Sequence, residues 1–174
     1  MDNFKNEDIL ISDLPKFENS KTNSIEPAYW KVLVINNIFR FVFLAAIIII
    51  VLLNVNVAKL FLWFAIIAYP IFTIFYFILL KKSFNFRSYA IREHDIFYRH
   101  GILSRKTTII PFIRIQHIAI NEGFIERYYK LSQLQIFTAG SDANDLKISG
   151  LLKEDAEKIK ELILGTIKIK TEEV

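Results

Sequence analysis

Few residues in this chain are spaced so that they could do chemistry. The three histidines, His94, His100 and His117, do not stand four residues apart and form no His-Glu-x-x-His pattern that would place metal ligands on one helix face. The chain has no cysteine, which excludes disulfides, thiolate metal sites and cysteine nucleophiles. We therefore predict that no metal is bound and that each histidine has a structural role.

Two pairs of carboxylates lie close in sequence, Glu122 with Glu126 and Asp142 with Asp145. The first pair would be neighbours on a helix, but two solvated charges explain it better. The second pair would need further oxygen ligands to bind a cation, and the sequence identifies none, so a polar loop is the favoured interpretation. No glycine-rich phosphate loop or nucleophile elbow accompanies them. The sequence predicts no catalytic residues and no cofactor, and hence no enzyme.

Basic residues are the more informative group. The net charge is +4, but residues 1–30 have a net charge of −3 and residues 81–115 one of +6. Each basic residue near an anionic cytoplasmic leaflet contributes ~1 kcal/mol of attraction. The basic cluster consists of Lys81, Lys82, Arg87, Arg99, Arg105 and Lys106. The ordinary positive flank of a membrane segment explains Lys81 and Lys82, whereas Arg99, Arg105 and Lys106 leave contact with lipid open.

Arg114 and Gln116 are further candidate contacts. One interpretation has them touch a partner protein, a lipid or another subunit. The other has Arg114 neutralise a carboxylate and fix the register of a strand. We favour the second because structural ion pairs are commoner than functional sites.

Two apolar segments must position these residues. Leu60 to Leu80 is a run of 21 uncharged residues, and as a helix it would span roughly 31 Å, about the thickness of a hydrocarbon core. Pro70 lies near its middle, where a bilayer favours a kinked helix over a broken one. We predict transmembrane helices at about 40–58 and 60–80, joined by a short turn within a membrane region 30–82. The two helices should form an antiparallel hairpin.

The basic residues around this hairpin predict its orientation. Lys31 and Arg40 precede it, Lys81, Lys82 and Arg87 follow it, and the turn has only Lys59. By the positive-inside rule, both termini and the following domain should lie in the cytoplasm, with the chain a multi-pass protein of the cell membrane. The charged stretch before the first apolar segment argues against a secretory signal peptide.

Beyond Lys82 the chain becomes polar, with short apolar alternations typical of half-buried strands. These are found at Ile96 and Tyr98, at Ile113 and Ile115, at Ile118 and Ile120, and at Leu134, Ile136 and Thr138. The phase slips near Gln116 and His117, which predicts a bulge, and Gly101 predicts a turn between two strands. Several antiparallel strands are the simplest explanation.

The last periodic segment is helical. Leu152, Ala156, Ile159 and Ile163 recur at helical spacing, and acidic residues in the first turn suit the helix dipole. The predicted organisation is a polar N-terminal cytoplasmic segment 1–29, the membrane region, a mainly antiparallel β domain 83–164 ending in an α-helix, and a C-terminal tail 165–174.

Several motifs resemble a known family. The runs Tyr98-Arg99-His100-Gly101, Ile110-Pro111-Phe112-Ile113-Arg114-Ile115-Gln116, Gly123-Phe124-Ile125-Glu126-Arg127 and Thr138-Ala139-Gly140 follow the order of the bacterial pleckstrin-homology-like (PH-like) family. Two helices before one such domain resemble its membrane-anchored, YdbS-like subgroup. The resemblance covers roughly residues 30–164 and implies a PH-like barrel or sandwich, with two packed antiparallel sheets closed at one end by a C-terminal helix. Lys130 departs from the pattern, because the family often has glycine there.

The residues and the resemblance together favour a non-enzymatic, membrane-anchored PH-like module that acts in membrane-protein assembly or membrane-surface interaction. One alternative is an accessory subunit of an envelope export or resistance system, and another is a self-assembling scaffold. The expected partners are the lipid bilayer, anionic phospholipid, and another membrane protein or a homo-oligomer. Nucleic acid is not an expected partner, because the basic residues border the membrane segment without an aromatic stacking platform.

Overall fold

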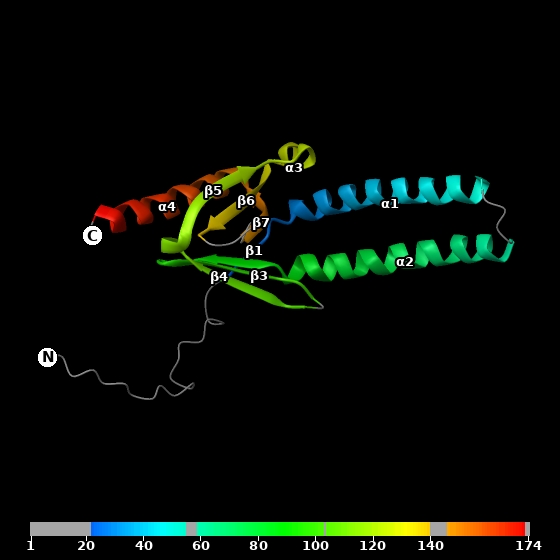
Figure 1. The fold of residues 1–174 in the computed structure, drawn as a ribbon, viewed down its shortest axis with the longest axis horizontal. Coiled ribbons are helices and arrows are strands. Elements are labelled where there is room, and N and C mark those ends of the chain that lie inside the picture. Colours follow the sequence, from blue (N-terminus) through cyan, green and yellow to red (C-terminus); the bar gives the residue numbers. More distant parts are fainter. Residues whose placement is uncertain (1–21, 55–58, 103, 140–145, 173–174) are drawn as a thin grey trace, which may run out of the picture.

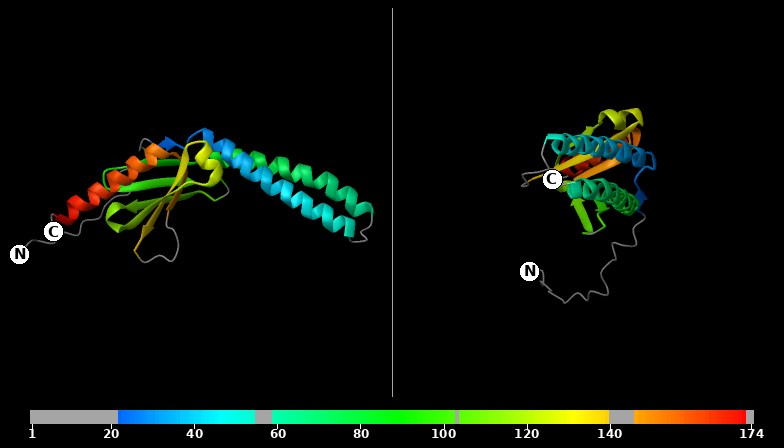
Figure 2. Two further views of the ribbon diagram at one scale, coloured as in Figure 1. Left: turned by 90° about the horizontal axis from the view of Figure 1, so that it is seen from above. Right: turned by 90° about the vertical axis from the view of Figure 1, so that its right-hand side faces the viewer.

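The computed structural model describes residues 22–54, 59–102, 104–139 and 146–172, and its most prominent feature is a pair of long helices extending from one end of a β-rich domain (Figure 1). Helix α1 spans Ala28–Asn54 and helix α2 spans Lys59–Phe86. Both contain segments long and apolar enough to cross a membrane. They lie side by side and antiparallel (Figures 1 and 2), which confirms the predicted hairpin, and α2 continues through Pro70.

Tyrosines of α2 join the two helices of the hairpin. The Tyr69 hydroxyl donates a hydrogen bond to the Phe41 carbonyl oxygen at 2.5 Å, and the Tyr76 hydroxyl donates one to Asn37 Oδ1 at 3.0 Å. The Asn37 side-chain amide in turn donates to the Leu33 carbonyl oxygen at 2.7 Å. Because an apolar environment offers no water to polar groups, these bonds satisfy the side chains that face the partner helix.

Helix α1 begins well before the predicted start near residue 40. Its first turns pack on the domain, where Tyr29 and Val32 are buried in the domain core. Apolarity alone did not reveal this extension, since the first two turns contain polar and aromatic residues rather than a long apolar run. Residues 55–58 of the predicted turn lie outside the described residues.

Seven strands form two antiparallel sheets. The first sheet has the order β1 (Asn23–Ser24), β2 (Ser88–Ile91), β3 (Asp95–His100), β4 (Lys106–Pro111), and the second has the order β5 (Ile115–Asn121), β6 (Leu131–Thr138), β7 (Leu146–Leu152). A 3-10 turn, η3 (Phe112–Arg114), connects the sheets, and a short helix, α3 (Phe124–Tyr128), connects β5 to β6. The predicted bulge is found between Ile115 and His117.

The C-terminal helix α4 spans Lys153–Glu172 and packs on the second sheet (Figures 1 and 2). Ala156, Ile159 and Ile163 are buried in the core that both sheets share, as their helical spacing predicts. Leu152, the first residue of the predicted helical pattern, is instead the exposed last residue of β7. The helix also extends into the predicted tail. Within the described residues no strand pairing joins the two sheets, so the predicted barrel or sandwich is a sandwich and not a closed barrel. The chain passes from β4 to β5 through η3 instead of bending one strand across both sheets.

Segments on both sides of the hairpin in the sequence contribute to the β domain. Strand β1 precedes α1 but pairs with β2, which follows α2. The Glu26 amide donates a hydrogen bond to the Gly150 carbonyl oxygen at 3.1 Å, and Ile25 is buried. Gly150 has φ +83°, and a Cβ there would lie 2.4 Å from Tyr29 Cγ. The start of α1 is therefore packed directly against β7.

The connection from α3 to β6 explains the departure at Lys130. This residue has φ 55°, in the left-handed region that glycine enters without steric cost. The glycine that the resemblance implies here would adopt this backbone conformation without cost, and Lys130 adopts it all the same.

Candidate functional site

The basic cluster lies where the hairpin meets the domain, and most of its members stack on aromatic rings. Lys81 Nζ is 4.5 Å from the centroid of the Trp30 ring. The guanidinium carbons of Arg99 and Arg105 each lie 5.0 Å from the centroid of Phe86, the last residue of α2. Cation–π contacts of this kind hold a charge in place without neutralising it. These charges therefore remain available at the hairpin end of the domain.

Two members of the cluster line a cavity between the sheets, which we call the basic cleft. It has a volume of about 440 Å³ and is lined by Ser83, Arg87, Tyr98, His100, Gly101, Lys106, Thr108, Gln133, Leu146, Lys147 and Ser149. Tyr98 and His100 of β3 are the register partners of Thr108 and Lys106 of β4. This pairing brings polar side chains together at the hairpin end of the first sheet.

The electrostatic environment of the basic cleft is positive. Burial lowers the pKa of His100, and the charges of Arg87 and Lys106 lower it further. His100 stacks on Tyr98 with ring centroids 5.0 Å apart. His100 Nδ1 and Thr108 Oγ1 are buried and have no hydrogen-bond partner among the described residues. None of the described residues that line the cleft is acidic.

A second cavity, the apolar groove, adjoins the basic cleft. Its volume is about 360 Å³, and it is lined by Tyr76, Leu79, Leu80, Ser83, Gly101, Ile102 and Ser104. The groove lies between α2 and the connection from β3 to β4. It shares Ser83 and Gly101 with the basic cleft, so the two cavities meet at the junction.

Helix α3 presents exposed aromatic residues on the other side of the hairpin. Phe124 is 91% exposed and Tyr128 is 82% exposed. The helix lies next to α1 (Figure 1), and Lys31 Nζ of α1 is 6.0 Å from the ring centroid of Tyr129. Large aromatic side chains so exposed to water are costly unless another apolar phase covers them.

The predicted carboxylate pair near α3 has two separate structural roles. The Gly123 amide donates a hydrogen bond to Glu126 Oε2 at 2.9 Å, which caps α3. Glu122 forms an ion pair with Lys153 at 2.9 Å, and this contact raises the pKa of Lys153. The Asp142 and Asp145 pair lies outside the described residues.

Arg114 and Gln116 lie at the opposite end of the domain from the basic cluster. Both are exposed, and the junction of β4 with β5 that contains them points away from the hairpin (Figure 1). Among the described residues Arg114 has no carboxylate partner, so the predicted neutralising ion pair is not found there. Lys82 is exposed and lines a shallow apolar groove on α2.

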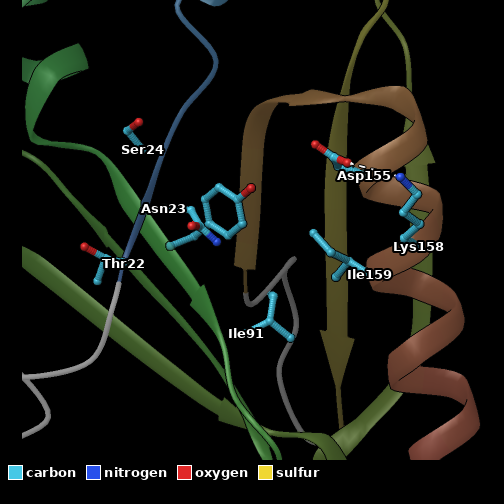
Figure 3. A pocket seen from close by; sticks show the side chains of 8 residues that line it. Thr22, Asn23, Ser24, Ile91, Asp155, Lys158 and Ile159 are labelled. Atoms are coloured by element: carbon cyan, nitrogen blue, oxygen red, sulfur yellow. Dashed lines mark ion pairs between the residues drawn. The ribbon is translucent and has the colours of Figure 1, made fainter.

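A larger groove of about 600 Å³ lies between the β1–β2 edge and α4 (Figure 3). It is lined by Thr22, Asn23, Ser24, Tyr89, Ile91, Asp155, Lys158 and Ile159. Asp155 and Lys158 form an exposed ion pair at 3.7 Å. Burial raises the pKa of Tyr89, with Asp155 and Glu26 adding to the effect, so its hydroxyl stays protonated. The described residues also contain no cluster of metal ligands. The charged side chains that line this groove are paired with each other, and the Tyr89 hydroxyl is not ionised, so its described residues do not indicate a reactive site.

Where the hairpin meets the domain, the residues that sequence reasoning missed include Thr108 and Lys147 of the basic cleft and the exposed Phe124 and Tyr128 of α3. The alternation that marked Ile96 and Tyr98 as one face of a strand continues to His100, and this was the available indication of a polar inner face. The contribution of Lys147 depends on how the two sheets pack. No pattern within one strand could predict that packing.

Comparisons with known proteins agree with the described architecture. The family model described as "Bacterial PH domain" matches residues 32–167. The "UPF0699 transmembrane protein YdbS" of Bacillus subtilis is 28% identical over 98 residues, which are 56% of this chain and 60% of that protein. The "UPF0699 transmembrane protein YdbT" of the same organism is 31% identical over 77 residues, 44% of this chain and 16% of that protein. No solved structure matches the chain.

Proposed function

Because the chain belongs to the bacterial PH domain family and has two helices apolar enough to cross a membrane, we propose that it is a membrane-anchored, non-catalytic module whose domain lies on the cytoplasmic surface of the bilayer. The main supporting observation is the exposure of Phe124 and Tyr128 beside α1. Aromatic rings are enriched at the membrane–water interface, where an apolar body and a polar environment meet. Docking of α3 on the bilayer would cover both rings.

The two sides of the hairpin have matching features. On the α1 side lie the aromatic residues of α3, and on the α2 side lies the connection from β3 to β4 with Ile102 and Arg105. Both connections point toward the hairpin (Figure 1). Apolar residues can enter the interface while neighbouring basic residues contact anionic headgroups, at ~1 kcal/mol for each basic residue. Contacts on both sides would keep the domain flat against the surface.

The attachment of the hairpin supports a fixed orientation of the domain. Tyr29 and Val32 at the start of α1 and Phe84 at the end of α2 are all buried in the domain core. A domain joined by a flexible linker would sample many orientations, whereas helices packed into its core hold it in one. With the positive-inside distribution of Lys31, Arg40 and Lys81, this arrangement favours the cytoplasmic face.

Assembly with another membrane protein is the second candidate function. The outer faces of both helices are exposed and strongly apolar, including Phe43, Phe72 and Phe75. Such faces can pack on a partner helix as well as on lipid. An export subunit and a self-assembling scaffold are special cases of this second candidate.

The proposal is tested by the depth of α3 in the bilayer. The chain has no cysteine, so a single cysteine at Phe124 can be labelled with a polarity-sensitive fluorophore in proteoliposomes. Lipids with a spin label at the headgroup level should quench this probe. The matched control is a label at Ile113, which is 72% exposed at the far end of the domain and should not be quenched. Equal quenching at the two positions, or none at either, would contradict the proposal.

A further inference from the structure

The adjoining cavities at the junction differ in chemistry. The basic cleft extends between the two sheets, and the apolar groove extends along α2, with Ser83 and Gly101 common to both. A ligand that occupies both must have a charged part and an apolar part in one molecule. This pairing places strong limits on the class of ligand.

The charged part must be an anion. Arg87, Lys106 and Lys147 line the basic cleft, and no described lining residue opposes them with a negative charge. Arg87 is positioned by Tyr29, with its guanidinium carbon 6.0 Å from the ring centroid. Arginine and lysine side chains that converge on one cavity are a common arrangement for binding phosphate.

Two residues that line the basic cleft have polar atoms without a partner in the described part of the fold. Thr108 Oγ1 and His100 Nδ1 are buried without a partner among the described residues. Buried polar atoms in folded proteins are nearly always hydrogen-bonded, so unpartnered ones next to a cavity indicate a missing partner. The Thr108 hydroxyl can donate to a phosphate oxygen. His100 can do so from whichever ring nitrogen holds its proton.

The apolar part must fit beside a membrane helix. Tyr76, Leu79 and Leu80 of α2 line the apolar groove together with Ile102. Leu80 is the last residue of the uncharged segment, immediately before Lys81 and Lys82. This is the level at which acyl chains give way to headgroups. The groove therefore opens where a lipid chain is at hand.

We propose that the junction binds one anionic phospholipid, with its phosphate in the basic cleft and the upper part of an acyl chain in the apolar groove. This inference rests on the proposed function, because the lipid reaches the cleft only when the domain lies on the bilayer. It differs from general attraction to a charged surface. A specific site holds one lipid and depends on residues inside the cleft, whereas surface attraction depends only on total charge.

The test compares two double variants of the full chain that lose the same charge. One is Lys106→Gln with Lys147→Gln, inside the basic cleft, and the other is Lys82→Gln with Arg105→Gln, outside it. All four side chains are exposed, so neither variant should affect folding. Each is placed in phosphatidylcholine nanodiscs with a small fraction of phosphatidylglycerol. Native mass spectrometry then counts bound phosphatidylglycerol and measures its affinity.

We expect one phosphatidylglycerol molecule on the native chain, binding on the order of twentyfold weaker to the cleft variant and within about threefold of native to the control. An equal loss of phosphatidylglycerol affinity in both variants would show that only surface charge matters and would overturn the proposal. Unchanged affinity in both variants would overturn it as well. Inorganic phosphate and glycerol 3-phosphate are added as competitors. They should fail to displace the lipid at concentrations that match its own. If they displace it fully, the cleft is a site for free phosphate and the lipid assignment is wrong.

The result is separable from the proposed function. The fluorophore at Phe124 reports docking of α3, on the opposite side of the hairpin from the basic cleft. A quenched probe without specific lipid binding would overturn this inference and leave surface docking intact. An unquenched probe would overturn both.

Discussion

The two ends of the same sandwich have different inner surfaces. At the end away from the hairpin, Ile96 of β3 and Ile110 of β4 are register partners and fully packed in the core. Along the same strand faces toward the hairpin, the pairs become Tyr98 with Thr108 and then His100 with Lys106. Sheet sandwiches normally fill this space with apolar side chains. At the hairpin end, polar side chains and a cavity therefore occupy part of the space between the sheets, next to the buried residues of the helix ends.

The largest loss of stability should come from disrupting the contact between β7 and the start of α1. Gly150→Ala places a Cβ 2.4 Å from Tyr29 Cγ at a residue with φ +83°. The clash and the strained backbone should lower the free energy of unfolding by about 3 kcal/mol. Thermal unfolding in detergent measures it. Gly165→Ala is the control, since its Cβ meets nothing within 4 Å and a helical alanine should stabilise by up to ~1 kcal/mol. Similar effects at both glycines would show that α1 is not held by β7.

The second-largest loss of stability should come from a core substitution at the end of the domain away from the hairpin. Ile110→Thr puts a hydroxyl into a side-chain environment that is only 5% exposed. The lost apolar contacts and the buried polar atom should cost about 2 kcal/mol. Denaturant titration of the detergent-solubilised chain measures the change. A cost near zero would mean that the far end is no better packed than the hairpin end.

Replacing a threonine by an apolar residue at position 108 should raise the free energy of unfolding, whereas Ile110→Thr lowers it. Thr108→Val replaces a buried hydroxyl that has no partner among the described residues with a methyl group of the same shape. Removing this unsatisfied group should stabilise the fold by about 1 kcal/mol, and it should weaken retention of phosphatidylglycerol. The same titration, with native mass spectrometry, measures both. A destabilised Thr108→Val chain would show that the hydroxyl is already bonded within the fold.

The smallest effect is a dependence on pH. Burial, Arg87 and Lys106 lower the pKa of His100 below its ordinary value, and Lys147 and Tyr98 also line its cavity. The unfolded chain therefore binds the proton more readily. His100 stabilises the fold fully above its ordinary pKa of ~6.5, and this contribution is lost as pH falls toward the folded value. The unfolding midpoints of native and His100→Gln chains, compared at about pH 8 and about pH 5, should show the smaller loss on acidification in His100→Gln. A larger loss in the variant would reverse the assigned direction.

The sequence predicted the elements that are specified by a pattern within one continuous segment. The uncharged run ending at Leu80 indicated a spanning helix, the alternation at Leu134 and Ile136 indicated a strand, and the spacing of Ile159 and Ile163 indicated the last helix. Each pattern is a property of a single element, and the structure has a long apolar helix, a strand and a final helix at these positions. The motif resemblance supplied the arrangement of two packed antiparallel sheets with a C-terminal helix.

The junction could not be predicted in the same way. Asn23 and Ser24 form a strand only because β2 lies beside them, and a two-residue strand has no periodicity. Residue type predicts burial for Phe124, yet its side chain is 91% exposed. The basic cleft combines His100 with Lys147 across two sheets, which requires the packing angle between them. Local patterns contain no information on any of these three arrangements.

The position of β1 has a consequence for how the chain is made. This strand leaves the ribosome first, but its partner β2 emerges only after both helices of the hairpin. A connection of more than sixty residues must be closed before the pair can form, and most of it is apolar enough to enter a bilayer. If the hairpin enters the bilayer as proposed above, the domain can be completed only after both helices have been synthesised. A chain in which β1 does not pair would leave the edge of β2 open to other chains and to proteases.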